Sequence, residues 1–398
     1  MQSITSNQYS YNLPVKKHKA VVNYLVTSVP IILIFDWLLN LEVINLQIGL
    51  ILKGVSVVIF GQLLVFKKHK IIGFKFKKLL LYFIYLNFIY ALLSENPIEN
   101  VYYSVRILYW VLGSLSFYYL FSNEFLSVVK FRKMILATIL IASLFTISLM
   151  IGSEEHQNAS AYLILWCLPI LFLFKQTTIV KILKLIAIIS IILTVKRGAM
   201  LALFVSLVFY FIGLLRISKL VINKIKIIVG GIFVFGFSFL ILFLIWAKIA
   251  IRLEDKGGSG RDVMYEGIFS RYINSDITEL VFGYGINSVQ KFTATFLAKN
   301  SKSVGIAAHS DWLQYMHDFG VFGILFMVLL HYFFIKLVRF HYKNKTNIYP
   351  TVLMSYSIFL LTTIYSFILN TPDAIFFGII IALISIETRK IKFLNQYA

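Results

Sequence analysis

The chain is poor in charged residues and almost free of cysteine. Only 14% of its 398 residues are charged and 59% are hydrophobic, whereas about a quarter of an ordinary soluble domain is charged. A globular core cannot bury so much apolar surface, which excludes a soluble enzyme. A nucleic-acid-binding protein is also excluded, because such proteins are basic but not apolar. Cys167 is the single cysteine, so neither an internal disulfide framework nor a thiolate metal site is expected.

The N-terminal residues lack the apolar run of a cleaved signal peptide. Residues 1–20 are polar and end in a basic stretch, Lys16 to Lys19. We therefore expect the first apolar run to stay in the protein as a membrane anchor.

Long apolar runs recur along the whole chain. A bilayer core needs about 20 apolar residues for each crossing helix, which predicts an all-α, polytopic integral membrane protein with about 12 transmembrane helices. The expected spans are residues 21–39, 43–66, 79–93, 101–121, 134–151, 161–174, 182–195, 199–215, 227–250, 321–335, 349–369 and 374–386.

Acidic residues are scarce, 17 against 38 Lys and Arg, and the basic residues are unevenly distributed. With the N-terminus in the cytoplasm, 26 of the 38 fall in alternate connections on the inner side, beside only Glu124 and Glu387. The inner face then carries +24 and the rest of the chain −3. This bias follows the positive-inside rule. We expect a multi-pass protein of the cytoplasmic membrane with both termini in the cytoplasm.

One connection, residues 251–320, is much longer than the others. It lies on the outer face in this topology, between the ninth and tenth spans, inside a single membrane domain of residues 1–398. Loops of this length are usually functional. It contains a flexible Lys256–Gly260 hinge, an amphipathic helix over Asp262–Asn274 predicted to lie on the membrane surface, and Phe282-Gly-Tyr-Gly-Ile286. The two glycines of that motif permit either a plain tight turn or a close approach to a ligand.

The loop ends in His309-Ser-Asp-Trp-Leu-Gln-Tyr-Met-His-Asp-Phe-Gly320. Ser310 is the expected N-cap of a helix, which leaves His309 just before it, free to face a cavity. Asp311 is either a first-turn capping acid or a functional group. His317 is expected to be structural.

Four stretches together resemble the bacterial O-antigen polymerase and O-antigen ligase superfamily. They are Thr194-Val-Lys-Arg-Gly-Ala199, Ser259-Gly-Arg-Asp262 with Phe282-Gly-Tyr-Gly285, His309-Ser-Asp-Trp-Leu-Gln314 with Phe319-Gly-Val-Phe-Gly-Ile324, and more weakly His156-Gln-Asn-Ala159. Lys196 and Ser310 stand where the family commonly has Ser and Asn. The Ser310-Asp311 form is commoner in capsule and exopolysaccharide polymerases than in ligases.

The resemblance implies glycan transfer from undecaprenyl pyrophosphate to an acceptor hydroxyl on the outer face. Guanidinium groups suit a departing pyrophosphate because they bind two of its oxygens and stay protonated. Arg197 and Arg261 are therefore expected to be catalytic, the alternative for Arg197 being a contact with lipid headgroups. His309 is the expected general base, since its ordinary pKa leaves it largely neutral at pH 7.

Five further residues are predicted to bind substrate. They are Asp311, Gly283, Tyr284, Gly285 and Arg106. Arg106 lies inside the fourth span, where a charge either serves function or pairs with an acid such as Asp36. No cluster of metal-ligand type stands out among the His and acidic residues, which predicts a metal-independent glycosyltransferase without a cofactor.

Three functions remain open at this point. The first is a polymerase that joins undecaprenyl-pyrophosphate-linked repeat units of capsule, exopolysaccharide or O-antigen. Its expected partners are these lipid-linked donor and acceptor oligosaccharides, the bilayer, a flippase and a chain-length regulator, with no nucleic acid. The second is a ligase that moves the finished glycan to lipid A core or protein. The third is a lipid-linked oligosaccharide flippase or transporter, which the asymmetric outer loop disfavours because transporters place polar sites at mid-membrane in paired repeats.

Overall fold

The computed structural model describes residues 19–40, 48–65, 71–92, 97–152, 159–174, 176–194, 196–244, 261–298, 308–366, 369, 371 and 373–397. The predicted Lys256–Gly260 hinge, the His156–Asn158 part of the weakest motif and the polar residues 1–18 lie outside this part of the chain.

Every regular element in the described residues is a helix. In chain order they are α1 (Lys19–Asn40), α2 (Ile48–Val65), α3 (Lys77–Leu92), α4 (Pro97–Ser122), α5 (Val128–Gly152), α6 (Ala159–Leu173), α7 (Thr178–Leu193), α8 (Arg197–Ile217), α9 (Val221–Leu244), α11 (Arg261–Ile273), α12 (Ile277–Phe282), α13 (Ser288–Ala298), α14 (Asp311–Lys343), α15 (Tyr349–Tyr365) and α16 (Ala374–Tyr397).

Each predicted apolar run overlaps one helix in the described residues, as expected for segments that must satisfy their backbone hydrogen bonds internally in lipid. Four helical stretches within the described residues are long and apolar enough to cross a bilayer. These are Ile48–Val65, Tyr103–Ser122, Arg197–Ile217 and Asp311–Lys343. The helices thus support a multi-pass membrane protein, while a total of twelve crossings and the outer placement of the long loop stay predictions.

The long helices form one bundle with α4 near its centre. In the most apolar stretch of α4, 72% of the residues are buried, whereas in that of α2 only 28% are. Helix α4 packs against α2 and α16, and α15 packs against α8 and α14. Trp110 on α4 and Trp166 on α6 both contact the ring of Phe377 on α16. Aromatic side chains thus fill the centre of the bundle.

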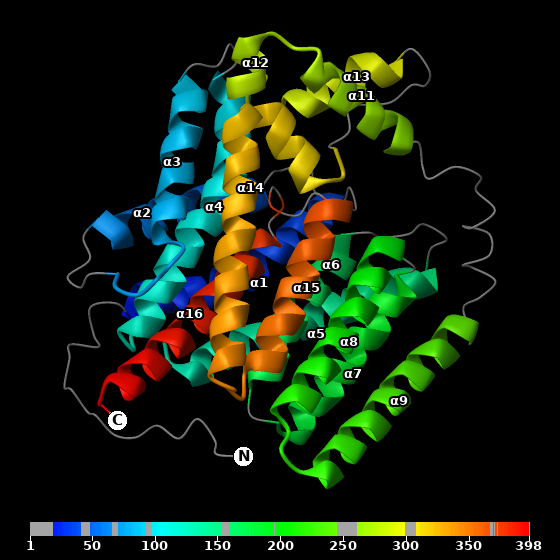
Figure 1. The fold of residues 1–398 in the computed structure, drawn as a ribbon. Coiled ribbons are helices and arrows are strands. Elements are labelled where there is room, and N and C mark those ends of the chain that lie inside the picture. The colour runs from blue at the N-terminus through cyan, green and yellow to red at the C-terminus, as the bar shows by residue number, and fades with distance from the viewer. Residues whose placement is uncertain are drawn as a thin grey trace.

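Three short helices, α11, α12 and α13, form a cap over one end of the bundle, where α14 begins (Figure 1). Residues Met264, Ile268 and Tyr272 of α11 form a small apolar core with Val289 of α13 and Met316 of α14. The amphipathic helix predicted for Asp262–Asn274 is therefore confirmed as a helix. Its buried face packs against α13 and α14, and its position on a membrane surface stays a prediction.

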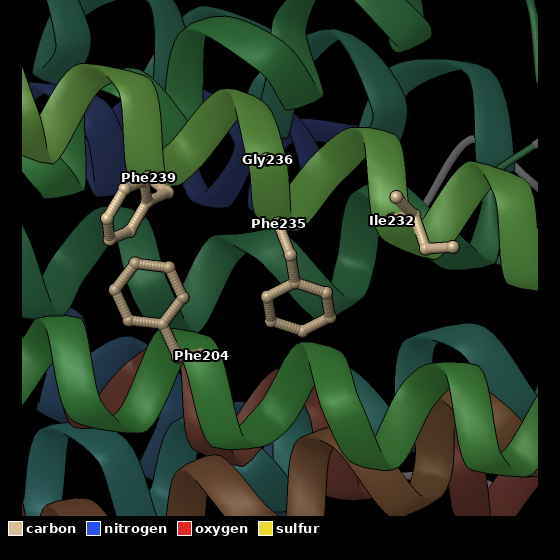
Figure 2. Close-up of a pocket in the computed structure, with 5 residues that line it drawn as sticks. All are labelled: Phe204, Ile232, Phe235, Gly236 and Phe239. Atoms are coloured by element: carbon tan, nitrogen blue, oxygen red, sulfur yellow. The ribbon is translucent and has the colours of Figure 1, made fainter.

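Helix α9 lies at the edge of the bundle, beside α7 and α8 (Figure 1). It leaves an apolar cavity of about 650 Å³ against α8, lined by Phe204, Ile232, Phe235, Gly236 and Phe239. Figure 2 shows Phe204 of α8 facing Phe235 and Phe239 of α9 across this cavity. An apolar opening of this kind, at the rim of the bundle, suits a hydrocarbon chain better than a sugar.

Candidate functional site

The start of α14 has the predicted form. Ser310 is its N-cap, with extended backbone, and its hydroxyl accepts a hydrogen bond from the Leu313 amide at 3.5 Å. His309 precedes the cap, is half-buried and has a φ of 51°. A left-handed backbone is uncommon for a residue with a side chain and is often found at functional sites. The N-cap at Ser310 therefore holds His309 in one defined backbone conformation.

Asp311 lies in the first turn of α14 and is fully buried. Its backbone amide donates to the Ser366 carbonyl at 3.1 Å, and its Oδ1 accepts from the Leu369 amide, also at 3.1 Å. The carboxylate therefore ties the start of α14 to the segment that follows α15. This contact with a distant segment differs from the first-turn capping role considered for Asp311, and both that role and substrate binding stay predictions.

The cap formed by α11, α12 and α13 contacts the backbone of His309 through α11. The Tyr265 hydroxyl donates to the His309 carbonyl at 2.9 Å. Arg261, the first residue of α11, is four positions before Tyr265, so the two share a face of that helix. The Tyr265 hydrogen bond thus joins α11, whose first residue is Arg261, to the backbone of the predicted base.

The Gly283-Tyr284-Gly285 turn docks onto a kink in α14. Gly320 breaks the helical backbone of α14 with a φ of 62°, and Gly283 has a φ of 75°. A Cβ on Gly283 would lie 2.5 Å from the Asp318 carbonyl and from the Gly320 nitrogen. The Tyr284 and Gly285 amides donate to the His317 and Asp318 carbonyls at 2.9 and 3.0 Å. The close approach made possible by Gly283 is thus to α14, and substrate binding by the three residues stays a prediction.

Arg271 lies beside the Gly283-Tyr284-Gly285 turn, although it was not predicted from the sequence as a site residue. Its guanidinium carbon lies 4.1 Å from the Tyr284 ring centroid and 4.7 Å from that of Phe292. The Tyr284 ring also stacks on His317 at 4.6 Å, and its hydroxyl bonds to that of Ser275. Cation–π contacts of this kind orient a guanidinium. The weak sequence signal for Arg271 was an arginine among aromatic residues in a loop of mixed charge.

Asp318 is the second functional group that sequence reasoning missed. Its carboxylate is buried and accepts from the Asn287 amide at 3.0 Å, the Ser288 hydroxyl at 2.9 Å and the Gln314 side-chain amide at 2.7 Å. It thereby caps the start of α13, where the helix dipole stabilises a negative charge. Gln314 accepts in turn from the Ala308 amide at 3.2 Å, beside His309. Asp318 therefore couples the cap to the backbone at His309.

Arg197 reaches the same end of the bundle from another direction. It is the first residue of α8 and is exposed. A Cβ on the adjacent Gly198 would lie 2.6 Å from the Tyr162 hydroxyl and 3.9 Å from the Tyr365 Cβ. Residue 365 ends α15, and the next residue, Ser366, accepts the hydrogen bond from Asp311. The starts of α8 and α14 thus both adjoin the end of α15.

Arg106 lies below the cap on α4. Its guanidinium carbon is 5.8 Å from the Tyr103 ring centroid, and the Tyr103 hydroxyl donates to the Gln290 side chain of α13 at 2.8 Å. The side chain of Asp36, its predicted alternative partner, lies outside the described residues. Arg106 is therefore attached to the underside of the cap through Tyr103.

Arg106, Arg197 and Arg261 thus lie on α4, α8 and α11, and His309 lies just before α14; a common site for the four residues stays a prediction. Across the described ranges no three His, Cys, Asp or Glu side chains gather in a possible metal site, and metal independence stays a prediction.

A comparison with protein families identifies this region. Residues 182–328 match the model of the O-antigen ligase family. The chain contains an O-antigen ligase family domain. The match runs from α7 to the middle of α14, so this domain includes all the predicted site residues except Arg106.

The resemblance to the O-antigen polymerase and ligase superfamily is thereby confirmed. Members of this family are glycosyltransferase-like enzymes, either ligases or polymerases. No curated protein matches the chain.

Proposed function

We propose that this protein is a polysaccharide polymerase of the cytoplasmic membrane that joins undecaprenyl-pyrophosphate-linked oligosaccharide repeat units on the outer face. Both termini lie in the cytoplasm in this proposal, and a flippase and a chain-length regulator act beside it. The observation that supports the proposal is that Arg197, Arg261 and His309 all lie within residues 182–328, which match the O-antigen ligase family, and that Tyr265 joins α11 to the backbone of His309.

The arginines serve the leaving group. When the bond between the anomeric carbon and the phosphate oxygen breaks, its electron pair goes to the pyrophosphate. Arg197 and Arg261 bind the oxygens of that pyrophosphate and stabilise the growing charge, as preorganised cations do best. Arg271, held between the rings of Tyr284 and Phe292, adds a third positive charge at the cap.

His309 serves the acceptor. It takes the proton of the attacking sugar hydroxyl while the hydroxyl oxygen forms the new glycosidic bond, so the proton ends on the imidazole and the charge on the pyrophosphate. The base must lie within hydrogen-bonding reach of that hydroxyl. The bond from Tyr265 to the His309 carbonyl keeps the backbone of the base in place during this step.

The apolar cavity between α8 and α9 supports a lipid-linked donor. Phe204, which lines it, follows Arg197 by seven residues on α8, a depth of about 10 Å along a helix. A pyrophosphate bound at Arg197 would therefore place the first isoprene units of its carrier beside this cavity. The same helix then binds the charged and the apolar part of one donor.

We predict that Gly236→Phe raises the KM for the lipid-linked donor about tenfold with kcat largely kept, because the ring occupies space for roughly two buried carrier methylenes. Gly236 lines the cavity, and a Cβ there meets nothing within 4 Å. Steady-state transfer by purified protein measures both constants.

Gly230→Phe is the matched control for that variant. Gly230 lies on the same helix, a Cβ there also meets open space, and it is not among the cavity-lining residues. Equal KM values for the two variants would place the carrier elsewhere.

A ligase is the second candidate, and the description of the matching family as O-antigen ligase favours it. Deletion of the gene distinguishes the two activities. Loss of a polymerase is expected to leave single repeat units transferred to the final acceptor, whereas loss of a ligase leaves long chains on the lipid carrier. The electrophoretic profile of the glycan after deletion is the measurement. Long carrier-bound chains would contradict a polymerase.

A further inference from the structure

A group of basic side chains surrounds a second cavity, at the end of the bundle opposite the cap. Its volume is about 510 Å³. One residue comes from the connection between α2 and α3 and the others from the last turns of α14. The lining consists of Lys75, Phe333, Lys336, Arg339, Phe340 and Lys343. Four cations from two separate segments therefore converge on one space with an aromatic wall.

Lys75 is held in place by its neighbours in sequence. Phe74 and Phe76 on either side of it are buried. The Phe74 ring stacks on Tyr118 of α4 at 4.5 Å, and the Tyr118 hydroxyl donates to the Ile72 carbonyl at 2.6 Å. The backbone that carries Lys75 is thus anchored to α4, and its charge is presented at a defined position.

The positive charge at this cavity lacks a balancing acid. The ammonium groups of Lys75 and Lys392 lie 6.0 and 5.8 Å from the same Phe340 ring centroid. Burial lowers the pKa of Lys75 from its ordinary value, and the charges of Lys392 and Lys336 lower it further. Within the described part of the chain, none of the four lining cations forms a salt bridge, and nearby Glu387 is paired with Lys390 at 2.8 Å. An anion bound here would remove this repulsion.

The exposed face of α14 leads from the cap toward this cavity and changes character on the way. Its exposed residues follow one helical stripe, apolar first and then basic. They are Val321, Leu325, Val328 and Tyr332, then Lys336, Arg339 and Lys343 with Tyr342 between the last two. The apolar part spans about 16 Å along the helix, close to the half-thickness of a hydrocarbon core of about 30 Å. The stripe thus matches a molecule with an anionic head and an apolar chain of one leaflet's length.

We propose that the cavity of Lys75, Lys336, Arg339 and Lys343 binds the phosphate headgroup of an anionic phospholipid, whose acyl chains lie along the exposed apolar stripe of α14. In the predicted topology this end of the bundle faces the cytoplasm, and basic pockets between transmembrane helices are known to suit such headgroups. The positive-inside rule alone requires basic residues near helix ends, but not their convergence on a cavity that continues into an apolar track.

The test is lipid binding to the full-length protein in detergent, followed by native mass spectrometry. Phosphatidylglycerol is compared with phosphatidylcholine of the same acyl chains. We expect Lys336→Gln/Arg339→Gln to weaken phosphatidylglycerol binding about thirtyfold, which corresponds to about 1 kcal/mol for each charge removed. Both side chains are exposed, so the variant keeps the packing of α14.

Lys224→Gln/Lys226→Gln is the matched control, because it removes two exposed cations from α9, on the same predicted face but away from the cavity. It is expected to bind phosphatidylglycerol as the unaltered protein does. Equal binding by the two double variants, or equal affinity of the unaltered protein for both lipids, would overturn the proposal. So would tight binding of inorganic pyrophosphate without preference for phosphatidylglycerol, which indicates a soluble phosphate ligand.

Discussion

Replacing Arg197, Arg261 or His309 with alanine, one at a time, is expected to abolish polymer formation while the protein is inserted at its normal level. Loss of a general base alone lowers a rate by about a hundredfold or more, and loss of one donor to a developing anion costs a similar factor. The structure supports a common effect, because Tyr265 of α11 bonds to the His309 backbone and the starts of α8 and α14 both adjoin the end of α15. Transfer between synthetic lipid-linked repeat units by purified protein measures each loss.

Arg216→Ala provides the matched control for Arg197→Ala. Both arginines are exposed and lie on α8, Arg197 in its first turn and Arg216 in its last. Only the former is expected to affect transfer, since the two residues are separated by the length of the helix. Full activity in all three site variants would refute the assignment of the site. Transfer without any membrane gradient also separates an enzyme from a transporter.

Asp318→Ala is expected to release the cap from the bundle. The change leaves the Asn287 amide, the Ser288 hydroxyl and the Gln314 amide without their buried acceptor. Unpaired buried donors cost about 1–3 kcal/mol each, so we expect the docked cap to lose about 3 kcal/mol. Proteolysis of residues 261–298 in the folded protein should then be about a hundredfold faster, because cleavage follows the population of the open form. Transfer activity falls with it, since Gln314 no longer holds the segment before His309.

Two further variants define the origin of this effect. Asp276→Ala removes another aspartate from the cap, but Asp276 is exposed and its side chain forms no capping hydrogen bond. It is expected to leave proteolysis unchanged. Asp318→Asn keeps the volume of the side chain and one acceptor oxygen. Its rate of proteolysis should lie between those of Asp318→Ala and Asp276→Ala. If Asp318→Ala resisted protease as the unaltered protein does, the carboxylate would have no role in docking.

Much of the site's local structure follows from short stretches of sequence. Ser310 as N-cap, Asp311 in the first turn and a helix over most of Asp262–Asn274 were all predictable. Each depends on residues within one or two helical turns, where capping and hydrophobic periodicity act directly. The glycines at 283 and 285 likewise predicted a turn, and both have positive φ.

The contacts of these elements were not predictable in the same way. Gly283 faces Gly320, and the carboxylate of Asp318 caps a helix that begins 30 residues earlier in the chain, at Ser288. Asp318 was visible only as one polar residue on a helix face, and Arg271 as one charge in a mixed loop. Nothing local in the chain indicates which distant backbone amide or aromatic ring such a side chain will meet.

The sequence by itself predicted a helical membrane protein and a resemblance to the O-antigen polymerase and ligase superfamily, which the family match over residues 182–328 supports, because hydropathy and short motifs depend on neighbouring residues. The tertiary structure alone decided how the site is assembled. It placed the starts of three helices at one end of the bundle and joined the cap to α14 through Asp318. At the other end it gathered Lys75 with the basic turns of α14 around one cavity. Both arrangements join residues far apart in the chain, and only packing of the whole bundle can bring such residues into contact.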